Sequence, residues 1–274
     1  MSASPIGSVA SIHRFPVKSM QGDTPASVEV DADGIVGDRT WALRDVETDK
    51  LVSAKRPRLW RSMLDCSATG TGDEVEVTLP DGSAFGITDA ALAPALSSFL
   101  GRDVAVEAAT GAQQGVYASD WPEIDGLTLA GEIDFPTNLT GEGTSFIDVG
   151  VLHILTTSSL DTLAKAAPEA TVDVRRFRPS ILFETPELDG FPENDWAGRS
   201  FAVGDAVITI GDPAPRCIMT TVEQGDLPRE PEVLQAIARE NRLTNPLGTF
   251  ACLGAYATVT QPGTITAGAP LTPT

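Results

Sequence analysis

The sequence predicts a mainly β protein of the α+β class. Short β-branched and apolar runs alternate along most of the chain with Gly, Asp and Pro turn residues, a pattern typical of barrels and sandwiches. Stretches with helical spacing are few. The 274 residues, 42% of them hydrophobic, suffice for one large domain or two modest ones with packed cores.

The N-terminal part is expected to be a succession of short strands. Residues 7–18 alternate well enough for a first strand that ends at Pro16, and Lys18 and Ser19 follow in a loop where they can face a ligand. A helix is expected over 89–100, between a candidate cap at Asp89 and Gly101. Further strands are expected at 27–31, 39–45, 51–54, 62–68, 74–79, 84–87 and 103–108.

Residues 110–145 are rich in Gly, Pro, Asp and Thr and show little periodicity. Such composition is typical of an irregular surface connection. The boundary between two domains is therefore expected here, with one domain over 1–109 and the other over 110–274.

The C-terminal part mixes strands with two helices. A helix of about ten residues is expected after a cap at Ser158 or Ser159 and before Pro168. A second helix is expected over 232–242 from its apolar spacing. The expected strands and hairpins are a strand at 151–156, a strand at 180–184, a hairpin with Gly204-Asp205 at its tip, and a last hairpin that turns at Pro262-Gly263.

Cys217 is the residue with the most distinctive surroundings. A β-prone run at 206–210 leads to Gly-Asp-Pro-Ala-Pro, where prolines interrupt strand pairing, and an apolar run at 218–222 follows. The cation of Arg216 next to Cys217 favours the thiolate, which is the form that acts as nucleophile and metal ligand. The alternative is that Cys217 is a small buried apolar residue, as most free cysteines are.

The net charge and the number of cysteines limit the classes of function that the protein can have. The net charge of −19 argues against nucleic-acid binding, and no apolar run is long enough for a bilayer span. Three widely spaced cysteines argue against a disulfide framework and for a reducing, cytoplasmic location, and the N-terminus lacks a secretory pattern. The first 65 residues hold nine basic and nine acidic residues, so this part is net neutral in an otherwise acidic chain. Either a bound anion or scattered surface ion pairs would explain its many basic residues.

Several common catalytic patterns are missing from the sequence. It contains no P-loop, GxGxxG, GxSxG or HExxH pattern, and its two histidines, His13 and His153, leave little material for a triad or a multi-histidine metal site. His153 lies in an apolar run and is expected to be a packed, hydrogen-bonded residue.

Five segments together resemble the MOSC-domain proteins that carry an N-terminal MOSC-associated β-barrel domain. This group includes the mitochondrial amidoxime-reducing component and its bacterial relatives, and the C-terminal domain of molybdenum cofactor sulfurase is a more distant relative. The segments are FPVKSM near the N-terminus, GDRTW at 37–41, FIDVGVLHILTT at 146–157, RRFRPSI at 175–181 and PRCIMTTV at 215–222. The resemblance implies a β-barrel-like domain over 1–109 and a MOSC β-barrel with a few peripheral helices over 110–274.

The resemblance also implies a molybdenum cofactor, with Cys217 as the metal ligand. Asp148 is then expected near the metal, where it handles protons. The residues that the resemblance assigns to cofactor binding are Lys18, Ser19, Arg39, Thr156, Thr157, Arg178, Ser180 and Arg216. A phosphate is recognised by such ammonium, hydroxyl and guanidinium groups.

The implied activity is the two-electron reduction of N-oxygenated small molecules, such as hydroxylamines or amidoximes. A separate electron-donor protein carrying flavin, haem or iron–sulfur is then required, because the chain has no motif for such a group. Two alternatives remain: a non-enzymatic carrier of the cofactor, and a sulfur-transfer protein with a persulfide on Cys217. Two departures from the family pattern, Ser180 in place of Asn and Pro215 before the cysteine, keep open a member that has lost its cofactor.

Overall fold

The computed structural model describes residues 4–110, 115–139 and 144–274, and it confirms a mainly β protein with 38% strand and 20% helix. The helices are α1 (Pro57–Trp60), α2 (Leu92–Leu100), α3 (Thr157–Ala166) and α4 (Pro231–Glu240). The strands of the first half are β1 (Gly7–Ile12), β2 (Ser27–Asp31), β3 (Gly34–Ile35), β4 (Trp41–Asp45), β5 (Ser67–Thr69), β6 (Glu76–Thr78), β7 (Ala84–Gly86), β8 (Val104–Ala108), β9 (Val116–Trp121) and β10 (Gly131–Pro136). The strands of the second half are β11 (Leu152–Thr156), β12 (Ile181–Glu184), β13 (Ser200–Val203), β14 (Ala206–Pro215), β15 (Arg242–Asn245), β16 (Gly248–Gln261), β17 (Gly263–Thr266) and β18 (Pro270–Pro273).

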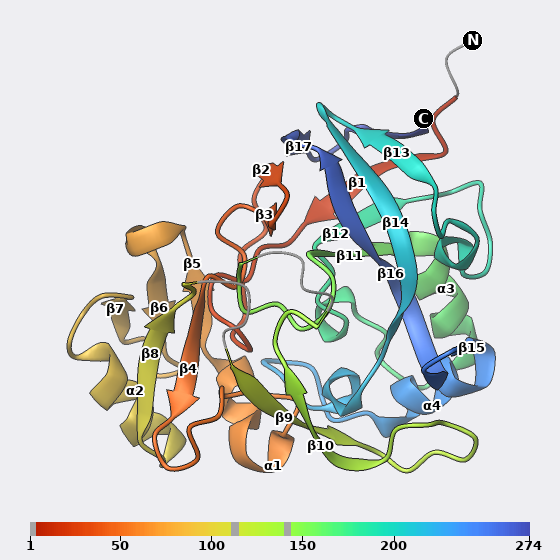
Figure 1. Ribbon diagram of the computed structural model, residues 1–274. Coiled ribbons are helices and arrows are strands. Elements are labelled where there is room, and N and C mark those ends of the chain that lie inside the picture. Colours follow the sequence, from red (N-terminus) through yellow and green to blue (C-terminus); the bar gives the residue numbers. More distant parts are fainter. Residues whose placement is uncertain (1–3, 111–114, 140–143) are drawn as a thin grey trace.

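A closed barrel forms the larger part of the molecule (Figure 1). Its strand order is β11-β12-β1-β18-β13-β14-β16, and β16 pairs back with β11 to close the sheet, while β15 extends from β16. Only the β11–β12 pair among these described strands is parallel. Closure removes the exposed sheet edges that an open sheet would present.

The first strands of the chain pack with the last ones. β1 pairs with β12 and β18, and β2 pairs with β17, so Val9, Val28 and Val30 share one apolar core with residues 147–271. The sequence assigns β1 and β2 to a domain over 1–109. Between β1 and β2 the chain passes through the N-terminal lobe, where Val17 and Met20 join the core of that lobe, and this brings Lys18 and Ser19 to the junction of the two parts.

The N-terminal lobe lies beside the barrel (Figure 1). It consists of the pair β4–β8, the sheet β5-β6-β7 and α2, around a separate core that includes Val17, Leu43, Trp60 and Leu96. α2 ends at Gly101, whose φ of 68° is left-handed, as expected for a glycine cap.

The segment 110–145 is not irregular throughout, and that expectation is wrong. β9 and β10 form an antiparallel ribbon within it, in which Tyr117 pairs with Phe135. The ribbon forms because aromatic side chains on one face pack together, with Trp121 also against Phe135. Residues 111–114 and 140–143 of the segment lie outside the described residues.

Three further local predictions are corrected. Residues Arg61–Asp65, which overlap the strand expected at 62–68, form a 3-10 helix. β14 continues to Pro215, because register shifts at Pro213 and Pro215 let the strand keep pairing with β16. β17 leaves β16 to pair with β2, so Pro262-Gly263 does not close a final hairpin.

The N-terminus of α3 is capped one turn earlier than expected. Thr156, not Ser158 or Ser159, is the cap, and its side chain accepts a hydrogen bond from the Ser159 amide. Within the part of the chain that the structure describes, no helix is both long enough and apolar enough to cross a membrane.

Candidate functional site

A cavity lies where the N-terminal lobe meets the barrel, and side chains from both parts line it. The charged side chains in its described lining are one carboxylate, Asp148, and six cations: Lys18, Arg39, Lys55, Arg176, Arg178 and Arg216. Since the whole chain carries a net charge of −19, this gathering of positive charge is a local property. A confined cationic cavity of this kind favours an anionic ligand.

Arg178 is the clearest sign of a missing partner. The residue is 8% exposed, yet its Nη1 and Nη2 atoms are buried without a hydrogen-bond partner among the described residues. Its guanidinium lies over the Phe15 ring, 3.9 Å from the centroid. Burial lowers the pKa of Arg178 to about 9, and nearby Arg39 adds to the effect. A buried, unpaired guanidinium is costly, so this group is poised for an anion.

Three of the cavity residues hold a backbone conformation that side chains rarely adopt. Ser19, Arg39 and Arg178 have φ values of 69°, 50° and 51°. Such left-handed conformations cost about 1–3 kcal/mol each outside glycine, and they cluster at functional sites. All three residues come from turns at the junction, where the surrounding fold holds them in place.

Lys18, Lys55 and Asp148 form a partly buried charge cluster, in which Lys18 is buried and the other two side chains are about one-fifth to one-quarter exposed. Asp148 accepts from Lys18 Nζ at 2.5 Å and from Lys55 Nζ at 2.8 Å, and Lys18 Nζ also donates to the Phe146 carbonyl. Both ammonium groups lie over the Tyr117 ring. The Asp148 carboxylate therefore bonds both ammonium groups, which would otherwise repel each other.

The protonation of this cluster follows from its geometry. Burial lowers the pKa of Lys18 to about 8, although Asp148 opposes the shift. Burial would raise the pKa of Asp148, but Lys18 and Lys55 outweigh burial and hold it well below its usual range. The two ammonium groups thus favour the carboxylate form of Asp148, and its expected proton-handling role stays a prediction.

Cys217 lies at the edge of the cavity, at the end of β14. It is 7% exposed and comes directly before the turn Ile218–Thr221. The neighbouring guanidinium of Arg216 donates to the Phe177 carbonyl at 2.8 Å and lies 3.4 Å from His153 Nε2. The two residues follow each other as the sequence indicates, and the Phe177 carbonyl holds the guanidinium of Arg216 in place.

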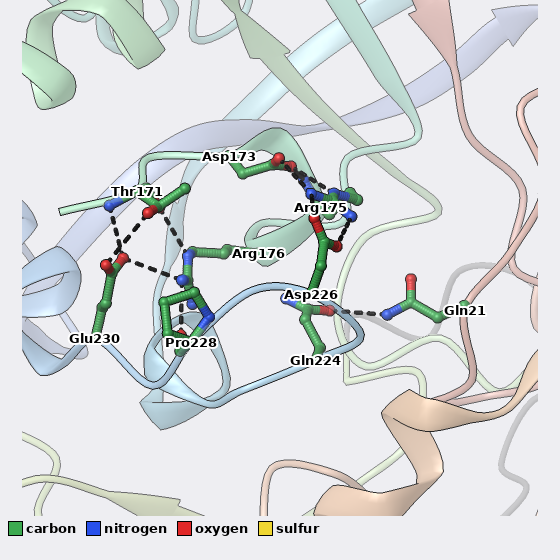
Figure 2. Close-up of polar contacts among 9 residues, drawn as sticks. All are labelled: Gln21, Thr171, Asp173, Arg175, Arg176, Gln224, Asp226, Pro228 and Glu230. Carbon is green, nitrogen blue, oxygen red and sulfur yellow. Dashed lines mark hydrogen bonds and ion pairs between the residues drawn. The ribbon is translucent and has the colours of Figure 1, made fainter. Parts of the chain in front are cut away.

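The loop behind Cys217 is held by a second buried arginine, Arg176, shown in Figure 2. Its guanidinium donates to the carbonyls of Thr171, Val222 and Pro228 and to the Glu230 carboxylate. Arg175 adds an ion pair to Asp226, and Gln21 reaches Gln224 from the N-terminal segment. Although Arg176 borders the cavity, its guanidinium has protein partners on all sides.

The structure brings together most of the residues that the sequence singled out, but not all. Lys18, Ser19, Arg39, Asp148, Arg178, Arg216 and Cys217 all line the cavity.

Thr156, Thr157 and Ser180 do not line the cavity. Thr156 caps α3, the Thr157 hydroxyl accepts from the Thr185 amide, and the Ser180 hydroxyl accepts from the His153 amide. Their expected contact with a cofactor does not fit these positions.

Several lining residues were not selected from the sequence as site residues, among them Lys55, Ser53, Tyr256 and His153. Lys55 lies in the basic run Lys55-Arg56-Pro57-Arg58, which has no strand or helix pattern, and Ser53 and Tyr256 carry no sequence signal that separates them from core residues. His153 is packed as expected: Nε2 bonds the Leu253 carbonyl, and burial lowers its pKa to about 3. It nevertheless borders the cavity.

The other two cysteines are buried elsewhere and unpaired. Burial raises the pKa of Cys66 and Cys252 to about 12, which keeps both as neutral thiols. Neither lines the cavity. Cys217 is therefore the thiol, among the three, that can act in the site.

Two family models match the chain. The MOSC domain model covers residues 144–272, and the MOSC N-terminal beta barrel domain model covers residues 6–122. None of the curated proteins searched matches the chain.

Solved structures with a similar fold include the YuaD protein of Bacillus subtilis, at 12% identity and a TM-score of 0.47 over 99% of this chain and 94% of that one. YiiM of Geobacillus stearothermophilus has 16% identity and a TM-score of 0.35, and the match covers 46% of this chain and 54% of YiiM. YiiM of Escherichia coli has 17% identity and a TM-score of 0.32 over the same shares. The chain thus spans about half the length of the YiiM proteins that it matches.

Proposed function

Because this chain belongs to the MOSC-domain proteins that carry the N-terminal β-barrel domain, we propose that it binds a molybdenum cofactor and reduces N-oxygenated small molecules of the hydroxylamine or amidoxime type. Cys217 is the proposed protein ligand of the metal. The observation that carries the proposal concerns Arg178, which lines the same cavity as Cys217: its two buried terminal nitrogens have no hydrogen-bond partner among the described residues.

The residues at the cavity suit the phosphate of such a cofactor. Arg178 offers two N–H groups on one fork, which matches phosphate geometry. Lys18 uses two of its three ammonium protons on Asp148 and Phe146, which leaves one for a ligand. The Ser19 hydroxyl accepts from the Ala54 amide, so its own proton is available to donate. Arg39, anchored to Asp38, adds charge.

A soft thiolate such as that of Cys217 is a suitable molybdenum ligand. When bound, the cofactor supplies two-electron removal of an oxygen atom. The overall reaction converts the N–OH group to N–H, consumes two electrons and two protons, and releases water. A separate electron-donor protein supplies the electrons in this proposal.

The cavity side chains have defined tasks in this scheme. Asp148 stays ionised and holds the ammonium groups of Lys18 and Lys55 in place. Lys18 Nζ, which has one ammonium proton left over from Asp148 and Phe146, donates to the cofactor phosphate. Arg216, fixed to the Phe177 carbonyl, keeps positive charge next to the thiolate.

The alternatives differ in what they require of Cys217. A persulfide carrier needs an accessible thiol, whereas Cys217 is 7% exposed. A cofactor carrier needs no space for a substrate, whereas a second cavity reaches Cys217. Ser180, one of two departures from the family pattern, lies outside the cavity, so its change leaves the phosphate-binding groups intact. Reduction is therefore the function favoured here.

Turnover with an artificial reductant tests the proposal. Protein from a host that makes molybdenum cofactor is mixed with reduced methyl viologen and either an amidoxime or a hydroxylamine. We expect turnover in the wild type, loss in Cys217→Ala, and retention in Cys252→Ala, a matched change of another buried thiol. Equal activity in both variants would contradict the role of Cys217, and a cofactor-loaded wild type without turnover would favour the carrier.

A further inference from the structure

A second cavity, larger and mostly apolar, opens from the same cysteine. It measures about 460 Å³, within the range of about 300–1,000 Å³ usual for small-molecule sites. It shares Lys55, Cys217 and Tyr256 with the cationic cavity. The two cavities therefore meet at Cys217, the proposed protein ligand of the metal.

The β9–β10 ribbon forms an aromatic wall of this cavity. Tyr117 and Trp121 of β9 and Phe135 of β10 line it, with ring centroids 6.1 Å apart for Tyr117–Phe135 and 6.2 Å for Trp121–Phe135. Phe250 of β16 also lines it. Flat aromatic walls favour planar apolar ligands.

Charge is scarce in the apolar cavity. Its charged lining residues, among those described, are Lys55, which is paired with Asp148, and the exposed Asp212. One polar group there has no partner: Trp121 Nε1 is buried without a hydrogen-bond acceptor among the described residues. An acceptor atom on a ligand would satisfy it.

We infer that this apolar cavity binds the body of a small, uncharged, aromatic substrate and directs its polar end toward Cys217. The aromatic wall holds the ring, and Trp121 Nε1 donates to an acceptor on the ligand. The polar end then lies next to the cationic cavity. The inference rests on the proposed function only for the identity of the reacting group. Binding of the aromatic body of the ligand does not depend on the reaction.

The test separates binding from turnover by using benzamide and acetamide, which share an amide end and contain no reducible N–O bond. Each is titrated into the protein without reductant, and binding is followed by NMR. We expect benzamide to bind at least about tenfold tighter, because only its ring buries apolar surface. Equal affinities would overturn the inference.

Single substitutions in the cavity wall test where benzamide binds. Phe135→Ala is expected to weaken benzamide binding roughly tenfold and to leave acetamide unchanged. Val116→Ala, on the same ribbon but outside the cavity lining, is the matched control and is expected to change neither. Trp121→Phe keeps a ring at the wall and is expected to weaken benzamide a few-fold through loss of the donor. Thermal melts of all variants check that each is folded, and equal effects of Phe135→Ala and Val116→Ala would contradict the placement.

The last comparison is between cofactor-loaded and cofactor-free protein. We expect benzamide to bind both forms, because the cofactor belongs in the cationic cavity. Loss of benzamide binding on loading would show that the cofactor fills the apolar cavity and would overturn the inference. If no molybdenum binds but benzamide binds as expected, the proposed function fails while this inference stands.

Discussion

Two arginines in one short turn, Arg176 and Arg178, have opposite surroundings. Both are buried, at 1% and 8% exposure. Arg176 donates to three carbonyls and to the Glu230 carboxylate, and Figure 2 draws its contacts with Thr171, Pro228 and Glu230. Neither terminal nitrogen of Arg178 has a hydrogen-bond partner among the described residues. A buried cation with a full set of partners stabilises the fold, whereas one without partners is retained for a ligand.

The largest expected effect is the contrast between Arg176→Met and Arg178→Met. Arg176→Met leaves Glu230 and three carbonyls without their donor, so the free energy of unfolding should fall by about 3–5 kcal/mol. Arg178→Met removes an unpaired buried charge, so the same quantity should stay level or rise by up to ~4 kcal/mol. Urea unfolding of the ligand-free protein measures both. Equal losses in the two variants would refute the distinction.

Asp148→Asn tests the cluster next to Arg178. The amide keeps the shape of the carboxylate but leaves the ammonium groups of Lys18 and Lys55 without a counter-charge, so unfolding free energy should fall by about 2–4 kcal/mol. Asp134→Asn, which breaks the exposed pair with Lys50, is the control and should cost at most ~1 kcal/mol. Urea unfolding of both variants gives the comparison, and similar costs would argue against a partly buried cluster.

Anion affinity should distinguish the two arginines in the opposite sense from stability, because it should depend on Arg178. Sulfate, which does not change its charge between pH 6 and 10, is titrated calorimetrically into cofactor-free protein. Loss of a charge-assisted contact worth roughly 1.5–3 kcal/mol should weaken binding at least tenfold in Arg178→Met. An unchanged affinity would remove Arg178 from the anion site.

The pH dependence of sulfate affinity identifies Lys18. Its pKa of about 8 lies below the ordinary lysine value, so Lys18 is charged below pH 8 and loses its proton as the pH rises through 8. Affinity should therefore begin to fall near pH 8 in the wild type, whereas in Lys18→Met the fall should begin only near pH 9, where Arg178 loses its proton. The same profile in both proteins would assign the titration to another group.

The smallest effect is expected at the rim of the network in Figure 2. Gln21→Ala removes the hydrogen bond to Gln224, one link between the N-terminal segment and the loop behind Cys217. Its cost should be about 0.5–1.5 kcal/mol of unfolding free energy, with sulfate affinity unchanged. A large loss of sulfate affinity would show that the loop, and not only the cavity, controls the site.

The sequence could predict those parts of the site that local pattern determines. Lys18, Arg39 and Cys217 follow strand ends or turns, where a loop can present a side chain, and the structure gathers them at one cavity. It could not predict that Thr156 caps α3 or that Ser180 bonds His153, because both partners depend on tertiary packing. Arg176 and Arg178 look alike in the sequence, and only their partners in three dimensions distinguish them.

The fold was predictable at the level of class and most strands, but less so where pairing is remote. β1 joins the C-terminal barrel and β17 pairs with β2 across 233 or more positions, which no local pattern reveals. The β9–β10 ribbon was missed because glycine, proline and aspartate obscure its alternation, although its aromatic residues hold it together. That ribbon supplies the wall of the apolar cavity.

Molybdenum and pterin content per chain tests the central claim, that the cations around Cys217 hold a molybdenum cofactor. The wild type, Cys217→Ala and Cys252→Ala are purified from a host that makes the cofactor and analysed by metal and pterin assay. The account predicts near-stoichiometric molybdenum in the wild type and in Cys252→Ala, and its loss in Cys217→Ala. Absence of molybdenum from all three, or equal content in all three, would contradict it.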